Sequence, residues 1–191
     1  MSTRQEILER ILECKREFYS LASEAKARRA VYNRWVELSY QLIKKSKTLS
    51  EDREATLESP PDGSKPERVA FEKWVNDSFK MIARAKNLTE ARETWLETPI
   101  GSDAEKLALT VMVGFCVTVN EAKEEWQSNS PEGEAGKEFL FKWIENCHSI
   151  EEIEEALGKT CHGSTARKVA LAKLETIKAR EQKERQVNQD V

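Results

Sequence analysis

Two Cys-His dipeptides, Cys147-His148 and Cys161-His162, are the residues of this 191-residue chain whose types best suit chemistry. Thiolate and imidazole groups together can bind zinc. However, a predicted short helix over residues 149–158 separates the pairs, and at about 1.5 Å of rise per residue it holds them about 15 Å apart. Zinc ligands lie only ~2.0–2.3 Å from the metal. We therefore expect structural roles for these four residues, without a metal site, a disulfide between the cysteines or a cofactor.

Adjacent carboxylates recur along the chain, as in Glu124-Glu125, Glu151-Glu152 and Glu154-Glu155. General acid–base catalysis requires two carboxylates in a cleft with their pKa values pushed apart. These pairs instead fall on predicted exposed helix faces beside lysines. The chain also has no glycine-rich phosphate loop and no nucleophile elbow. The sequence therefore predicts no catalytic residues and a protein that is not an enzyme.

Basic side chains cluster within residues 26–47, where a basic helix could contact phosphates. Glu24 and Glu37 dilute the cluster, and Trp35 is explained as a core residue. Nucleic-acid binding is therefore an alternative function. The cluster consists of Lys26, Arg28, Arg29, Arg34, Lys44, Lys45 and Lys47.

Internal repetition predicts the elements that position these residues. Five large apolar residues, here called anchors, are spaced 39, 38, 31 and 31 residues apart: Trp35, Trp74, Met112, Trp143 and Leu174. Apolar residues also precede each anchor by four positions, on the same helix face: Val31, Ala70, Ala108, Phe139 and Ala170. Large apolar residues precede each anchor by seventeen positions: Phe18, Leu57, Trp95, Trp126 and Leu157.

Helix caps recur in step with the anchors. A capping box pairs Ser, Thr or Asn with a Glu three residues later, and the predicted pairs are Thr3–Glu6, Thr48–Glu51, Asn87–Glu90, Thr118–Glu121 and Ser149–Glu152. The chain is thus predicted to be all-α, a short α-solenoid of about five helix-turn-helix units with a period of 31–39 residues. It would form one domain with segments 1–47, 48–86, 87–117, 118–148, 149–178 and a polar tail, 179–191.

The period resembles that of tetratricopeptide-like helix–turn–helix arrays. The Trp-Leu-Gly-Tyr signature of those arrays is absent, and the turn carries Pro-x-Gly-Ser instead. The likeness therefore concerns architecture alone and implies no binding residues. In the 48–86 unit, Asp52 and Arg53 stand where the apolar stripe needs an apolar residue, so its short helix is predicted to pack worst.

The N-terminal segment 1–47 reads either as one long helix or as a hairpin turning near residues 20–23, and the repeat register favours the hairpin. Its apolar residues point to more than one side, so we expect an uncovered face that docks a partner or a second copy. The alternative is that the two N-terminal helices cover each other completely as a hairpin. The proposed contact residues are Phe18, Tyr19, Tyr32, Leu38 and Tyr40. The segment has 11 Lys and Arg against 6 Asp and Glu, whereas residues 48–147 have 12 against 20, so the two could attract.

The start of the chain is charged throughout, and no apolar run approaches the ~20 residues of a membrane helix. We therefore expect a cytoplasmic location and no membrane partner. The leading functional hypothesis is a non-catalytic protein–protein interaction or adaptor scaffold, because repeat arrays present extended binding surfaces. The alternatives are a nucleic-acid-binding protein using residues 26–47 and a metal- or redox-dependent regulator using the Cys-His pairs.

Overall fold

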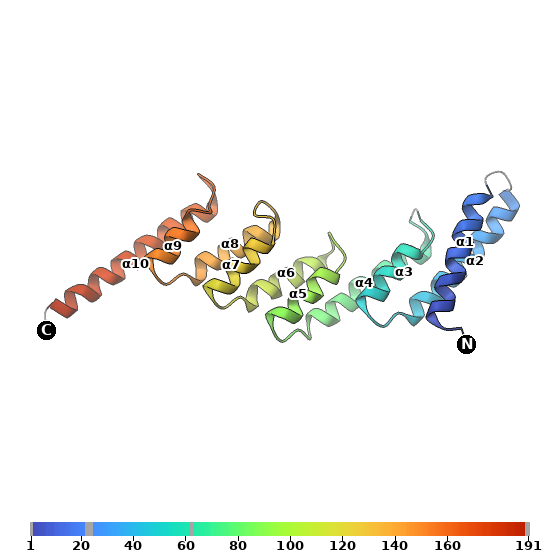
Figure 1. Ribbon diagram of the computed structural model, residues 1–191, viewed down its shortest axis with the longest axis horizontal. Helices are drawn as coiled ribbons and strands as arrows, with labels where there is room; N and C mark the ends of the chain where they lie inside the picture. Colours follow the sequence, from blue (N-terminus) through green and yellow to red (C-terminus); the bar gives the residue numbers. More distant parts are fainter. Residues whose placement is uncertain (1, 22–24, 62, 190–191) are drawn as a thin grey trace. The chain divides into compact units, whose positions relative to one another are not determined.

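The computed structural model describes residues 2–21, 25–61 and 63–189, with side chains up to Gln186. The described chain is all-helical, which confirms the all-α prediction, and Figure 1 labels its helices along the chain. The helices are α1 (Arg4–Ser20), α2 (Ala25–Lys45), α3 (Leu49–Glu58), α4 (Lys65–Ile82), α5 (Leu88–Glu97), α6 (Asp103–Phe115), α7 (Val119–Ser128), α8 (Glu134–Asn146), α9 (Ile150–Leu157) and α10 (Thr165–Gln189). In these ranges, no helix combines the length and apolar character that a membrane span requires.

The helices fall into two compact units, residues 1–110 and 111–191, with the boundary inside α6. In the first unit α1 packs on α2 and α3 packs on α4. These pairs meet through contacts of α1 with α3 and of α2 with both α3 and α4, and α5 packs on α3 and α4. The N-terminal segment is therefore a hairpin of two helices, as the register favoured; residues 22–24 of its expected turn lie outside the described residues.

The second unit also contains helix pairs. Helix α7 packs on α8, and α9 packs on α10 (Figure 1). Helix α8 connects the pairs through contacts with both α9 and α10. The side-chain amide of Asn146 fixes the end of α8 by donating to the carbonyls of Cys116 and Thr118, each at 3.0 Å.

All five predicted caps form. In α1, α7 and α9 the cap and the Glu bond reciprocally, as a capping box requires. In α3 and α5 the cap oxygen accepts from the third helical N–H, but Glu51 and Glu90 accept from the N–H of the residue before the cap, Lys47 and Lys86. Each short helix therefore begins where the sequence predicts.

The spacing of the anchors predicts burial well on α2, α4, α6, α8 and α10. Four anchors are 6% exposed or less, and Trp74 is half-buried. All five residues that precede an anchor by four positions are 2% exposed or less. The seventeen-residue spacing predicts burial less accurately. Of the five residues that precede an anchor by seventeen positions, four are half-buried and Leu57 is 66% exposed.

Leu57 is exposed although it matches the seventeen-residue spacing, because the turn it was counted across is one residue longer than the others. Sixteen residues separate the caps Thr48 and Ser64, whereas fifteen separate Asn87 from Ser102. Counting back from Trp74 therefore lands one residue too late on α3. The corresponding residue, one position earlier, is the half-buried Thr56, and the neighbouring Ala55, which is 1% exposed, faces the core.

A hydroxyl or thiol follows each of the first four anchors by four residues, a regularity that the sequence reading missed. Each is a small side chain that donates to the carbonyl of its own anchor, so its polar group is satisfied inside the helix. The donors are Ser39 at 2.9 Å, Ser78 at 2.8 Å, Cys116 at 3.6 Å and Cys147 at 3.2 Å. Counting forward from the anchors would have found this pattern.

Gly136, in the first turn of α8, is required by a close backbone approach. A Cβ atom there would lie 2.1 Å from the carbonyl oxygen of Ser130 and 2.9 Å from the Cα of Pro131, which are backbone atoms that cannot yield cheaply. We expect Gly136→Ala to destabilise the second unit by about 2–3 kcal/mol. The control is Gly114→Ala, where a Cβ meets nothing within 4 Å; this change should be neutral or stabilise by about 0.5 kcal/mol. Urea denaturation followed by circular dichroism measures both, and equal effects would contradict the packing described.

Candidate functional site

The first unit contains a groove formed by α3, α4 and α5. It consists of two adjoining hollows of about 290 and 520 Å³ that share Leu49, Met81, Arg84 and Glu97. We call their combined surface the α3–α5 groove. The other lining residues are Lys47, Thr48, Ser50, Asp77, Lys80, Ala85, Glu90, Glu93 and Thr94.

Local hydrogen bonds hold the three walls in place. The Ser46 hydroxyl donates to the Leu42 carbonyl at 3.1 Å, immediately before Thr48 caps α3. The Trp74 indole N–H donates to the Glu97 carbonyl at 2.8 Å, which ties the end of α5 to α4. Trp35 makes the same bond one pair earlier, to the Glu58 carbonyl at 2.7 Å. An anchor of one pair thus positions the first helix of the next.

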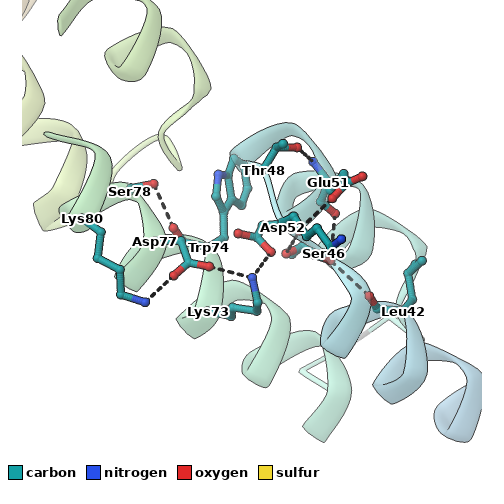
Figure 2. Close-up of polar contacts among 12 residues, drawn as sticks. Leu42, Ser46, Thr48, Glu51, Asp52, Lys73, Trp74, Asp77, Ser78 and Lys80 are labelled. Carbon is teal, nitrogen blue, oxygen red and sulfur yellow. Dashed lines mark hydrogen bonds and ion pairs between the residues drawn. The ribbon is translucent and has the colours of Figure 1, made fainter. Parts of the chain in front are cut away.

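A chain of alternating charges runs along the α4 wall and behind it (Figure 2). The Lys73 ammonium lies 2.5 Å from Oδ1 of Asp52 and 2.6 Å from Oδ2 of Asp77. The other Asp77 oxygen lies 2.6 Å from Lys80. Asp52 is only 1% exposed, and its Oδ2 has no hydrogen-bond partner among the described residues.

The burial of Asp52 corrects the prediction that α3 packs worst. The α3 stripe does contain a carboxylate, but Lys73 from α4 compensates for it across the helix pair. The sequence reading considered α3 alone, and the partner lies 21 residues away. In the sequence, Lys73 directly precedes the anchor Trp74, and Asp77 follows Lys73 by one helical turn. This pattern was the available signal for the charged partner of Asp52.

Three linked side chains, Asp52, Lys73 and Asp77, have shifted pKa values. Burial raises the pKa of Asp52, although Lys73 opposes the shift. Burial alone would lower the pKa of Lys73, but its hydrogen bonds to Asp52 and Asp77 outweigh burial and raise it. For Asp77 the hydrogen bonds from Lys73 and Lys80 outweigh burial and lower the pKa. A general base or nucleophile works best with a pKa near the operating pH, so Lys73 and Asp77 suit recognition of charge better than proton transfer.

Several groove charges remain available to a ligand. Arg84, Glu93 and Glu97 are exposed, and none of them has an ion pair with another described residue. Lys47 is also exposed beside the α3 cap. The groove thus offers unpaired charges of both signs around the half-exposed side chain of Met81, which is 45% exposed.

The Cys-His pairs are not brought together as a ligand set. Cys147 is buried in α8's C-terminal cap and donates to the Trp143 carbonyl, whereas Cys161 is exposed in the turn between α9 and α10. Both His148 and His162 are exposed. Within the described ranges no group of three or more His, Cys, Asp or Glu could hold a metal ion.

The four cysteines predict a simple labelling result. Cys14, Cys116 and Cys147 are buried and Cys161 is exposed. Burial raises the pKa of Cys147 to about 11, so its reactive thiolate is scarce at neutral pH. We expect a thiol reagent at pH 7.5 to label one cysteine rapidly in the folded chain and all four in denaturant. Cys161→Ser should abolish the rapid phase, and rapid labelling of that variant would contradict the burial.

The residues proposed for nucleic-acid contact are mostly exposed. Lys26, Arg28, Arg29 and Arg34 lie along α2, with Lys44, Lys45 and Lys47 at its end; only Lys45 is half-buried. The Arg28 guanidinium stacks on the Phe18 ring at 4.4 Å from its centroid, and Arg34 lies 3.5 Å from Glu17. Two of the proposed cations are therefore already engaged.

We expected a docking interface on an apolar face of residues 1–47. That face is mostly internal. Leu38 is 2% exposed and lies in the core of the hairpin, so it is unavailable as a contact residue. Phe18, Tyr32 and Tyr40 are half-buried, and only Tyr19, at 63%, is exposed. The Phe18 ring packs against Tyr19, Tyr32 and Trp35 at centroid distances of 5.4, 6.0 and 5.9 Å. The two helices thus cover most of each other's apolar surface.

Comparisons of the chain with protein-family models, curated proteins and solved structures found no match.

Proposed function

We propose that this chain is a non-catalytic protein–protein interaction scaffold built from repeated helix pairs. The packing within the first unit supports this, because α1, α3 and α5 contact one another in order while α2 contacts α4. The first helix of one pair thus packs on the first helix of the next pair, and the second helix packs on the second, as in a solenoid. The recurring caps, anchors and anchor-bonded donors support the same architecture.

The α3–α5 groove is the observation that carries the functional proposal. Its walls are rigid helices, and its unpaired Arg84, Glu93 and Glu97 face solvent. Electrostatic complementarity at such a surface gives specificity for a charged partner. The pKa of Asp77 is lowered and the pKa of Lys73 is raised, so both lie further from neutral pH than usual. This favours binding over catalysis.

Copurification from the native cell, followed by reconstitution, tests this function. We expect a tagged chain to retain a protein that re-forms a stoichiometric complex with it when both are purified, as measured by light scattering. A folded chain that retains no protein capable of reconstitution would contradict the proposal, as would turnover of a substrate by the purified chain alone.

Nucleic-acid binding is a second candidate, favoured by the exposed Lys26, Arg28 and Arg29 of α2 beside the exposed Tyr19. A phosphate-contacting surface gives affinity that falls steeply with salt. Gel shifts of single- and double-stranded probes over a salt series measure this. Reversing Arg29 and Lys26 to Glu should abolish the shift if α2 binds phosphates, and absence of any shift at low salt would reject this candidate.

A further inference from the structure

We propose that the α3–α5 groove binds an amphipathic helix of a partner protein that presents a basic, an aliphatic and an acidic side chain on successive turns. This inference rests on the proposed scaffold function and specifies the chemistry of its partner.

The two ends of the groove differ in charge. The smaller hollow is lined by Glu90, Glu93 and Glu97 with Arg84 as its one cation. The three carboxylates follow one another at intervals of three and four residues, so they share a face of α5. Glu90 is engaged by the Lys86 N–H and by Asn87, which leaves Glu93 and Glu97 for a ligand. A basic side chain complements this end.

The larger hollow has the opposite balance. Its cations are Lys47, Lys80 and Arg84, and its carboxylates are Asp77 and Glu97. Asp77 already accepts from Lys73 and Lys80, so it cannot neutralise a further cation. Lys47 and Arg84 therefore remain to face an acidic side chain.

Two of the four residues that line both hollows, Leu49 and Met81, are apolar. Met81 lines both hollows and is 45% exposed, and beneath it Leu49 is 4% exposed. Methionine is unbranched and adapts to the shape of an apolar partner side chain. An aliphatic residue between the two ligand charges fits this position.

A helical occupant suits the groove better than an extended one. An extended peptide needs partners for its backbone N–H and C=O groups, whereas the walls here are helices whose backbone is bonded internally. A helix satisfies its own backbone and packs its side-chain ridges between those of neighbouring helices. On such a helix, residues spaced by about four lie about 6 Å apart on one face, which places the three side chains in line.

Three labelled alanine-based helical peptides test the proposal by fluorescence anisotropy. Each peptide has a central Leu with one charged residue four positions before it and one four positions after it. These two residues are Lys and Glu in the first peptide, Lys and Lys in the second, and Glu and Glu in the third. We expect the Lys–Leu–Glu peptide to bind at least about tenfold more tightly than either of the others. Arg84→Glu should reduce that affinity about tenfold and favour the two-Lys peptide, while Glu93→Lys with Glu97→Lys should favour the two-Glu peptide.

The matched control is Arg53→Glu, an exposed α3 residue that does not line the groove. It should leave all three affinities unchanged, and circular dichroism verifies that each variant is folded. Equal affinities for the three peptides, no binding at millimolar concentration, or the same loss with Arg53→Glu would overturn the proposal. If the copurified partner still forms its complex with the folded Arg84→Glu, Glu97→Lys variant, the scaffold function stands and only the groove assignment fails.

Discussion

Replacing Trp143 with Ala is expected to destabilise the second unit by about 3–5 kcal/mol, the cost of deleting a large buried side chain. Trp143 is 0% exposed, and its ring centroid lies 5.6 Å from that of Trp126 on α7. The Lys123 ammonium lies over the same ring at 5.6 Å. The substitution would therefore remove contacts that join α7 to α8 and leave a cavity between them.

Trp143→Phe is the matched control for this prediction. It keeps an aromatic ring beside Trp126 but replaces the bicyclic indole by a smaller phenyl ring, and it removes the indole N–H, which is buried without a hydrogen-bond partner among the described residues. We expect the Phe variant to lose less than half as much stability as the Ala variant. Because two compact units can unfold separately, amide hydrogen exchange within α7 and α8 is the measurement of choice. A loss below about 1 kcal/mol for Trp143→Ala would remove this residue from the core.

Replacing Lys73 with Met should cost about 3 kcal/mol at pH 7, because it leaves the Asp52 carboxylate buried without its cation. Lys73 makes both of its ion pairs within the first unit, at 2.5 and 2.6 Å. The control is Lys80→Met, which breaks an ion pair whose lysine side chain is 65% exposed. Exposed pairs contribute about 0–1 kcal/mol, so denaturation midpoints should separate the two variants clearly.

The cost of Lys73→Met should fall as pH is lowered. Burial raises the pKa of Asp52 above its unfolded value of about 3.9, so folding favours the protonated carboxyl. The stability linked to that proton is present below the unfolded pKa and is lost as pH rises through the folded pKa. Without Lys73 the folded pKa rises further, and the deficit at pH 7 should shrink towards pH 4.

A double variant tests the cause of that deficit. Asp52→Ala combined with Lys73→Met removes the buried carboxylate of α3 together with its cation, and the corresponding residues of α5 and α7, Ala91 and Ala122, are both buried. The double variant should recover most of the stability. A Lys73→Met variant as stable as wild type at pH 7, or a double variant no better than the single, would contradict the compensating role of Lys73.

Local signals predicted the fold well because they act within one helix or turn. Thr118 and Ser149, with a Glu three residues on, mark their helix starts without reference to the rest of the chain. The spacing of four residues around each anchor likewise follows from helix geometry alone. Leu57 was misplaced because that count crossed a turn with one additional residue.

Contacts between helices could not be predicted in this way. Leu38 was expected to be available for docking, but it is buried in a core cluster to which α1, α2, α3 and α4 all contribute. The groove residues Met81, Arg84 and Glu97 come from two helices, and no local pattern distinguishes them from other exposed residues. Asp52 looked unfavourable within α3 and becomes interpretable only beside Lys73.

Amide hydrogen exchange of this chain, measured with and without its copurified partner, tests both the scaffold function and the position of the binding surface. We expect slower amide exchange in residues 47–50, in residues 81–84 at and just after the end of α4, and in α5, with exchange in α1 and α2 unchanged. Protection confined to α1 and α2, or none anywhere in the presence of saturating partner, would contradict this expectation.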